Sequence, residues 1–381
     1  MDNLDRSIGF YIHIPFCKSK CHYCDFNSFA GMEDYIKPYF KALKHEIESY
    51  EEELRGCTVN TIYIGGGTPS SVDASYIYEV INTCAGKFNL RKGMEISVEA
   101  NPGTLSYDKV LDYRDVGINR LSIGLQAWQS HLLRYIGRIH SAGEFVESFE
   151  LARKAGFENI NVDLMFSLPG QSINDWHYTL ERVAGIEPEH ISCYGLKIEE
   201  GTPFGERLDS GELILIDDES DREMYYLAID ILRKKGFKHY EISNFAQPGF
   251  ECGHNLIYWN AEPYIGVGAG AHSYFQGKRF NNLYKINDYI SALSRQEGPS
   301  ENVQIIDRKE SIKEYMILRL RLIDGIDADE FEKRFGENIF KLFARQFDRL
   351  LKRGLLESDG KLIKLSPLGL DLANQVFLEF I

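Results

Sequence analysis

Three closely spaced cysteines are the residues in this sequence whose type and spacing most clearly indicate chemistry. Cys17, Cys21 and Cys24 follow the pattern Cys-x3-Cys-x2-Cys. Thiolates are soft ligands that favour zinc, copper or an iron–sulfur cluster. A site closed by protein alone requires four ligands, so three cysteines on a four-iron cluster would leave one iron open for a substrate or cofactor. The alternatives are reduced core thiols or a zinc site with His13 or His22 as the fourth ligand.

The composition indicates the setting of this site. The chain has 381 residues, of which 44% are hydrophobic, and 43 Lys and Arg against 57 Asp and Glu give a net charge of −14. The cysteine count of seven is odd, which disfavours a secreted disulfide scaffold. Neither a signal-peptide pattern nor a run of about 18 apolar residues is present. We therefore expect a cytoplasmic protein with no transmembrane segment, and the acidic balance disfavours nucleic acid as a partner.

Alternating strand and helix patterns predict the elements that position the cysteines. Six short β-branched runs are each followed by an amphipathic stretch, which is typical of consecutive βα units with a parallel sheet. Six units are fewer than the eight that close a barrel, so we predict an α/β fold, an open (β/α)6 partial barrel. The predicted strands are Ile8–Ile14, Val59–Ile64, Met94–Ala100, Arg120–Gln126, Ile160–Phe166 and His190–Ile198. The predicted helices are Asp34–Leu54, Asp73–Lys87, Ser106–Val116, Gly143–Ala155, Asn174–Ala184 and Asp221–Lys235.

The chain is predicted to have three parts. Residues 1–236 form the partial barrel, and residues 237–300, rich in Gly, Asn and aromatics, are expected to be loops with short strands that cover it. Residues 301–381 are expected to form a mostly helical, winged-helix-like domain. With 14 Lys and Arg against 15 Asp and Glu, this domain lacks the basic charge of a DNA reader. Its predicted elements are helices over Ser311–Leu322, Asp329–Phe335 and Ile339–Arg353, a hairpin over Leu355–Leu365, and a last helix from Ser366.

Polar and glycine residues stand where the predicted strands end. The second strand runs into Gly65-Gly-Gly-Thr-Pro-Ser70, a turn type that leaves backbone N–H groups free for a ligand. Glu99 and Gln126 end the third and fourth strands, and Asp163 lies within the fifth. A carboxylate inside an apolar strand requires a partner, so Asp163 either contacts a ligand or forms a buried salt bridge. Arg138 either binds a carboxylate through two hydrogen bonds or is an ordinary surface arginine.

The cysteine motif in its context, Tyr11-Ile-His-Ile-Pro-Phe-Cys-Lys-Ser-Lys-Cys-His-Tyr-Cys-Asp-Phe26, resembles the radical S-adenosylmethionine (SAM) superfamily. Within it, the motif resembles the group of oxygen-independent coproporphyrinogen dehydrogenases and HemW-type haem chaperones. The resemblance spans about residues 8–275 and implies a [4Fe–4S] cluster whose fourth iron is chelated by SAM, with an electron donor such as flavodoxin or ferredoxin. The residues that match the group's cofactor-binding positions are Tyr11, Tyr23, Gly66, Gly67, Thr68, Glu99, Gln126, Arg138 and Asp163.

This sequence differs from the dehydrogenases in two features of its N-terminal region. The dehydrogenases carry a fourth cysteine two residues after the third, where this sequence has Phe26. They also carry a longer N-terminal segment, whereas only seven residues precede the first predicted strand here. Both departures argue against coproporphyrinogen decarboxylation.

The segment from His254 to Trp259 matches the HNxxYW signature of the HemW type. The match implies haem binding, with His254 as the iron ligand and with Tyr258 and Trp259 against the macrocycle. Cys252 and His272 are rival ligands. The implied function is a chaperone that binds haem, a [4Fe–4S] cluster and SAM and transfers haem to an acceptor protein. A coproporphyrinogen III oxidase or another radical SAM enzyme is the second hypothesis, and a zinc-binding interaction protein is the third.

Overall fold

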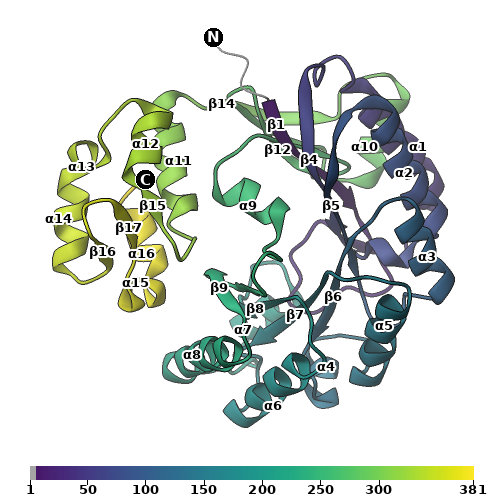
Figure 1. The fold of residues 1–381 in the computed structure, drawn as a ribbon. Coiled ribbons are helices and arrows are strands. Elements are labelled where there is room, and N and C mark those ends of the chain that lie inside the picture. Colours follow the sequence, from purple (N-terminus) through teal and green to yellow (C-terminus); the bar gives the residue numbers. More distant parts are fainter. Residues whose placement is uncertain (1–5) are drawn as a thin grey trace.

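A 12-stranded sheet forms the centre of the computed structural model, which describes residues 6–381. Its order is β14-β13-β12-β11-β1-β4-β5-β6-β7-β8-β10-β9, and every pair from β11 to β8 is parallel. All six predicted strands lie in this parallel part, which confirms the open α/β partial barrel (Figure 1). These strands are β1 (Arg6–Ile14), β4 (Cys57–Gly66), β5 (Asn89–Ala100), β6 (Arg120–Gln126), β7 (Ile160–Phe166) and β8 (His190–Gly195).

The six predicted helices are also present and cover the outer side of the sheet (Figure 1). Helices α5 and α6 begin with capping boxes at Ser141 and Ser172, in which side chain and backbone satisfy each other's hydrogen bonds. The first helix ends at Ser49 rather than Leu54, because residues 50–56 form turns. The observed bounds are α1 (Ile36–Ser49), α2 (Ala74–Lys87), α3 (Tyr107–Asp115), α5 (Ala142–Lys154), α6 (Ile173–Ala184) and α8 (Asp218–Lys234).

The segment 237–300 does more than cover the barrel. It supplies a seventh parallel strand, β11 (Tyr264–Val267), which pairs with β1, and it extends both edges of the sheet with antiparallel strands. The predicted boundaries at residues 236 and 300 stay predictions, but the sheet is continuous across both, since β14 runs from residue 300 to residue 305. The added strands are β9 (Lys238–Glu241), β10 (Asn244–Ala246), β12 (His272–Phe275), β13 (Lys278–Asn282) and β14 (Ser300–Ile305).

The HNxxYW run folds as the helix α9 (Gly253–Trp259), so the expectation of a loop there was wrong. The Glu95 carboxylate on β5 accepts hydrogen bonds from the backbone N–H groups of Gly253 (2.8 Å) and His254 (3.3 Å). These groups have no partner within the helix, so a carboxylate from a distant strand stabilises its start. The sequence patterns also missed the short helices α4 (Ser130–Tyr135), α7 (Pro203–Asp209) and α10 (Ile286–Ser294).

The C-terminal domain has its own apolar core and a three-stranded sheet of order β15-β17-β16, consistent with the winged-helix-like prediction. The predicted helix over 339–353 breaks at Phe343, and the last predicted helix breaks at Leu372. The elements are α11 (Arg308–Arg319), β15 (Ile326–Asp327), α12 (Ala328–Phe335), α13 (Ile339–Leu342), α14 (Ala344–Lys352), β16 (Leu356–Ser358), β17 (Leu362–Leu365), α15 (Pro367–Asp371) and α16 (Ala373–Leu378).

Backbone and ionic contacts attach the C-terminal domain to the partial barrel. Ile242 N–H donates to the Arg321 carbonyl, and Ile323 N–H donates to the Tyr240 carbonyl, each at 3.1 Å. The Arg334 guanidinium donates to the backbone carbonyl of Asn260, just after α9. The domain therefore contacts the helix that carries the HNxxYW residues.

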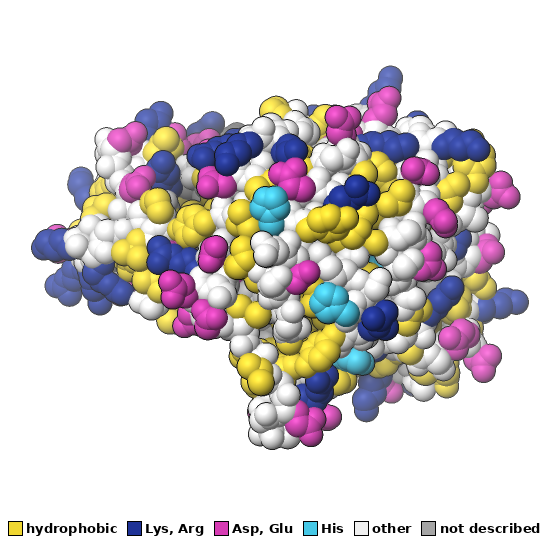
Figure 2. Space-filling view, turned by 90° about the horizontal axis from the view of Figure 1, so that it is seen from below, with side chains coloured by type: hydrophobic (Ala, Val, Ile, Leu, Met, Phe, Trp, Pro, Cys, Tyr) yellow, Lys and Arg dark blue, Asp and Glu magenta, His cyan; other side chains and the backbone are white. Residues whose placement is uncertain are grey.

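The surface carries charges of both signs. In Figure 2, Lys and Arg side chains alternate with Asp and Glu over much of the face shown. Dark blue side chains gather mainly at the left end, the side on which Figure 1 places the C-terminal domain. Among the described helices, none combines the length and apolar character that a membrane crossing requires.

One buried carboxylate connects α1 to the segment beyond residue 260. The Glu46 side chain, 1% exposed, accepts hydrogen bonds from Gly268 N–H (2.8 Å), Asn282 Nδ2 (2.6 Å) and the Tyr289 hydroxyl. Burial raises the pKa of this carboxyl to about 7. Three groups from separate elements thus depend on one side chain for their hydrogen bonds.

Replacing this carboxylate tests its role in holding the fold. Glu46→Ala leaves three buried donors without an acceptor, so we expect the free energy of unfolding to fall by about 3 kcal/mol or more. Glu48→Ala, two residues along on the exposed side of the same helix, should change it by less than about 0.5 kcal/mol. Urea denaturation measures both, and equal losses for the two variants would contradict this role.

Candidate functional site

The three cysteines lie at the carboxyl end of the parallel strands. Cys17 ends the short strand β2 (Phe16–Cys17), and Cys21 and Cys24 lie in the loop that leads to β3 (Phe29–Ala30). All three are half-buried free thiols. They line one cavity of about 470 Å³, which we call the cofactor cavity. The structure therefore brings the predicted metal ligands together.

Of the two histidines considered for a zinc site, His13 has both ring nitrogens in hydrogen bonds, whereas His22 has one. His13 Nε2 lies 2.8 Å from the Asn27 carbonyl oxygen and its Nδ1 lies 3.0 Å from the Tyr11 hydroxyl. Burial lowers the pKa of His13 to about 4, so the ring is neutral. His22 Nδ1 lies 3.0 Å from the Tyr135 carbonyl oxygen. Among residues 6–381, neither ring converges with the cysteines on one metal-ion position.

The thiols instead fit a multi-iron cluster. Within residues 6–381, no group of three or more Cys, His, Asp or Glu side chains converges as a single metal ion requires. Three cysteines around a wider cavity suit a cluster, in which each thiolate binds a different iron. The Cys17 sulfur is 3.5 Å from Thr68 Oγ1, and Arg138 Nη1 is 3.6 Å from the Cys21 sulfur. Both neighbours can donate to a thiolate.

The turn after β4 approaches the cysteines closely. Gly66 has a φ of +117°, a conformation that favours glycine, and a Cβ there would lie 2.5 Å from the His13 ring. A Cβ on Gly67 would lie 2.7 Å from the Phe16 carbonyl oxygen and 3.0 Å from the Cys17 sulfur. Only glycines allow the backbone to pass this near to the cysteine loop.

Glu99 at the end of β5 is a carboxyl group that lines the cofactor cavity. It accepts hydrogen bonds from the Tyr63 hydroxyl (2.9 Å) and the Gly66 N–H (3.1 Å). Burial, together with the nearby Asp163 carboxylate, raises the pKa of Glu99 to about 7. A cationic group beside this carboxylate would favour its ionised form.

Asp163 on β7 is hydrogen-bonded but not ion-paired. Its carboxylate accepts hydrogen bonds from Ser122 Oγ and Asn161 Nδ2, each at 2.9 Å. No described Lys, Arg or His forms an ion pair with it, so the buried salt bridge considered from the sequence is absent from residues 6–381. Asp163 lines the cofactor cavity, and its contact with a ligand stays a prediction.

Arg138 and Gln126 are held by local geometry. The Arg138 guanidinium donates to Asn101 Oδ1 (2.8 Å) and to the Gly124 carbonyl, and its Nε is buried without a partner. It is therefore not an ordinary surface arginine. Gln126 has a φ of +71° at an irregular step in the β6–β7 pairing, which is unusual for a residue with a side chain.

The structure collects most of the predicted cofactor-binding residues in the cofactor cavity but separates Tyr11 from them. Tyr11 lines a second cavity of about 580 Å³, which we call the aromatic cavity. Its role as a cofactor-binding residue stays a prediction. The predicted residues that line the cofactor cavity are Cys17, Cys21, Tyr23, Cys24, Gly66, Gly67, Thr68, Glu99, Gln126, Arg138 and Asp163.

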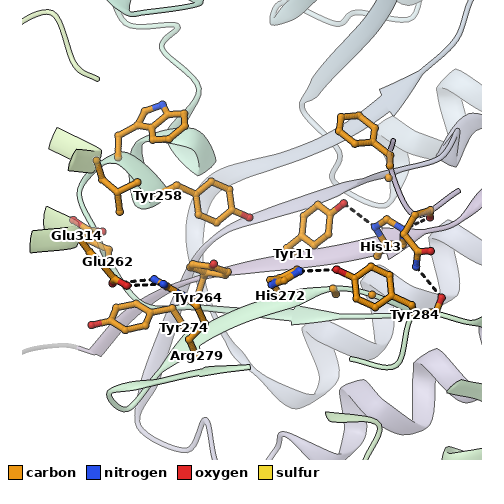
Figure 3. Close-up of a pocket in the computed structure, with 18 of the residues that line it drawn as sticks. Tyr11, His13, Tyr258, Glu262, Tyr264, His272, Tyr274, Arg279, Tyr284 and Glu314 are labelled. Atoms are coloured by element: carbon orange, nitrogen blue, oxygen red, sulfur yellow. Dashed lines mark hydrogen bonds and ion pairs between the residues drawn. The ribbon is translucent and has the colours of Figure 1, made fainter. Parts of the chain in front are cut away.

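The aromatic cavity adjoins the cofactor cavity. Asp25, Phe26, Gly66 and Glu99 line both. Helix α11 of the C-terminal domain contributes Glu314, which forms a two-pronged ion pair with Arg279 of β13 (2.5 and 2.9 Å; Figure 3). The other aromatic side chains of this cavity are Tyr11, Tyr258, Trp259, Tyr264, Tyr274 and Tyr284.

The structure does not place His254 in the wall of either cavity. The side chain is 1% exposed, with Nδ1 2.8 Å from Thr61 Oγ1 and Nε2 2.9 Å from the Tyr258 hydroxyl. Burial, with Arg120 nearby, lowers the pKa of His254 to about 3. In this conformation His254 holds Tyr258, which does line the aromatic cavity. Cys252 is fully buried, so neither cavity exposes it to an iron.

Several site residues were missed from the sequence. Asn101 connects Arg138 to Thr68, and its place just after a predicted strand was the available signal. His13 was considered from the sequence only as a zinc ligand, whereas in the structure it orients Tyr11. The tyrosines from β11 onward gave no signal beyond aromatic richness, because only the fold shows that they face one cavity.

Comparisons with known proteins agree with this arrangement. A family model described as the radical SAM superfamily matches residues 11–183, and the HemN C-terminal domain matches residues 306–372. The E. coli coproporphyrinogen III oxidase HemN has a similar structure, with a TM-score of 0.86 over 99% of this chain and 90% of that one. At 23% sequence identity, this likeness supports the fold alone.

Full-length relatives are more informative about the family. The heme chaperone HemW of Lactococcus lactis subsp. lactis (strain IL1403) is 38% identical over 379 residues, which cover 99% of this chain and 98% of the relative. The heme chaperone HemW of Bacillus subtilis (strain 168) is 36% identical over 372 residues, or 97% and 98% of the two chains. At this identity and coverage, the chain belongs to the HemW haem chaperone family of the radical SAM superfamily.

Proposed function

We propose that this protein binds haem in the aromatic cavity and transfers it to an acceptor protein. The observation that carries the proposal is the position of that cavity, which shares Gly66 and Glu99 with the cofactor cavity. The cofactor cavity would hold the [4Fe–4S] cluster and SAM that the superfamily implies. Relatives named heme chaperone HemW, similar over almost their whole length, support this function.

The thiols of Cys17, Cys21 and Cys24 would each bind one iron, which leaves the fourth iron open to SAM. Arg138, next to the Cys21 sulfur, stabilises negative charge on that thiolate. When bound and reduced, the cluster supplies the electron that cleaves a C–S bond of SAM. A donor of the flavodoxin or ferredoxin class would reduce the cluster. The reduced thiols of Cys17, Cys21 and Cys24 support a reducing, cytoplasmic setting.

The residues around Glu99 suit the charges of SAM. SAM carries a sulfonium and an amino group, and Glu99 offers a carboxylate that the Gly66 N–H and the Tyr63 hydroxyl already orient. The glycine turn keeps side chains away from the space beside Cys17. These residues would therefore orient the methionyl end of the ligand toward the cysteines.

The aromatic cavity suits a large, flat, apolar molecule with carboxylates. Tyrosine and tryptophan faces pack well against a macrocycle, and a volume of about 580 Å³ lies within the usual range for cofactor sites. Arg279 already binds the Glu314 carboxylate in a two-pronged geometry, which a haem propionate would match. Haem is therefore the ligand that this cavity supports best.

A radical enzyme acting on a porphyrinogen is the second candidate. The wall shared by the two cavities would bring a ligand in the aromatic cavity close to SAM, which favours this alternative. Against it, Phe26 lies where the dehydrogenases carry their fourth cysteine, and its exposed side chain lines both cavities.

Iron content tests the cluster ligands. We expect anaerobic reconstitution to give about four irons per chain, and Cys17→Ala, Cys21→Ala or Cys24→Ala to abolish binding, because the cluster has no spare protein ligand. Cys84→Ala, which removes a buried thiol from α2, should retain the iron. Zinc in protein purified without oxygen, or iron retained by all three variants, would contradict the proposal.

SAM affinity should depend on pH through Glu99. Its pKa of about 7 means that the carboxyl becomes ionised between pH 6 and pH 8, and the ionised form attracts the cationic ligand. At each pH, the SAM affinity of the natural protein is divided by that of Glu99→Gln. We expect this ratio to rise about tenfold from pH 6 to pH 8. The ligand's own titration cancels in this ratio. Calorimetric titration measures the affinities, and Glu150→Gln on the exposed side of α5 is the control.

A turnover assay separates the two candidate functions. We expect the reduced protein, incubated with SAM and coproporphyrinogen III, to form no protoporphyrinogen, because Phe26 replaces the cysteine of the dehydrogenases. The products are measured by chromatography with fluorescence detection. Protoporphyrinogen formed over many turnovers would instead establish the enzyme.

A further inference from the structure

Three histidines lie at or near the aromatic cavity, and they differ in the state of their ring nitrogens. Both nitrogens of His13 have hydrogen-bond partners, and so do both nitrogens of His254. A ligand to haem iron requires an imidazole nitrogen with a free lone pair and access to the ligand. In the described conformation, neither His13 nor His254 meets this condition.

His272 differs from both. It begins β12, its side chain is exposed, and it lines the aromatic cavity. Only its Nε2 has a partner among the described residues, the Tyr284 hydroxyl at 3.3 Å. Figure 3 shows this ring in the cavity near Tyr11 and Tyr264. His272 therefore offers an imidazole nitrogen, Nδ1, that is not already engaged.

The Nε2 atom of His272 would hold the imidazole ring in a fixed orientation. A metal-bound histidine usually holds its ring with a hydrogen bond from the other nitrogen. With a proton on Nε2 donated to the Tyr284 hydroxyl, Nδ1 carries the free lone pair. Partial desolvation of the ring, together with Arg279 nearby, lowers the pKa of His272, so the ring stays neutral at physiological pH. This is the protonation state that binds iron.

We infer that His272 is the axial ligand of haem iron in the aromatic cavity and that Tyr284 is its positioning residue. This inference rests on the proposed function. It assigns His254 a different task, which is to hold Tyr258 in the cavity wall through Nε2.

The experiment is a titration of the full-length protein with ferric haem, followed by the Soret band and by electron paramagnetic resonance. We expect His272→Ala to shift the Soret band and to weaken haem binding roughly tenfold or more. Added imidazole should restore the natural spectrum, which a purely structural role would not predict. Tyr284→Phe should change the spectrum less, because it removes only the orienting hydroxyl. His272→Gln serves as a second variant, and His177→Ala, on the exposed side of α6, as the control.

The possible results separate this inference from the proposed function. If His254→Gln abolishes the axial-ligand spectrum in folded protein while His272→Ala and His272→Gln leave it unchanged, the ligand assignment is wrong and haem binding stands. If the natural protein does not bind one haem per chain, the proposed function fails. Loss of the spectrum in both His272 variants, with rescue by imidazole, supports the assignment.

Discussion

Parallel pairing from β11 to β8 is the constraint on which the site depends, because parallel strands place all their carboxyl ends at one edge of the sheet. The cysteine loop, the glycine turn and Glu99 come from successive strands, and pairing brings them to one cavity. The sheet stops short of a closed barrel, and β11 adds a seventh parallel strand beside β1. The second cavity forms next to the first, and Gly66 and Glu99 belong to both.

Buried polar contacts between distant segments then position the segments that line the aromatic cavity. Glu46 connects α1 to Gly268, Asn282 and Tyr289, and Glu95 stabilises the start of α9. Each of these carboxylates satisfies backbone or side-chain donors that water cannot reach. Both therefore act on the aromatic cavity from outside, by fixing the segments that line it.

Local sequence patterns predicted the parallel core well, because the hydrophobic periodicity and the helix-capping residues of each βα unit lie within that unit's own sequence. Strands β6 and β7 were predicted to the residue. Helix α9 was not predicted, because its first N–H groups depend on Glu95, far away in the sequence. The same difference between local and long-range contacts distinguishes the residues of the cofactor cavity from those of the aromatic cavity. Motifs near the cysteines located the cofactor cavity, whereas the aromatic cavity depends on pairings and on the docking of α11 that no local pattern encodes.

The contribution of α11 to the aromatic cavity also bears on the order in which the protein is made. Every residue that lines the cofactor cavity lies between Cys17 and Glu199, whereas the aromatic cavity needs residues up to Leu318 of the C-terminal domain. Domains fold largely as they leave the ribosome, starting from the N-terminus. During translation, the cofactor cavity has all its residues before the aromatic cavity does, so a growing chain acquires its cysteine site first and its complete aromatic cavity last.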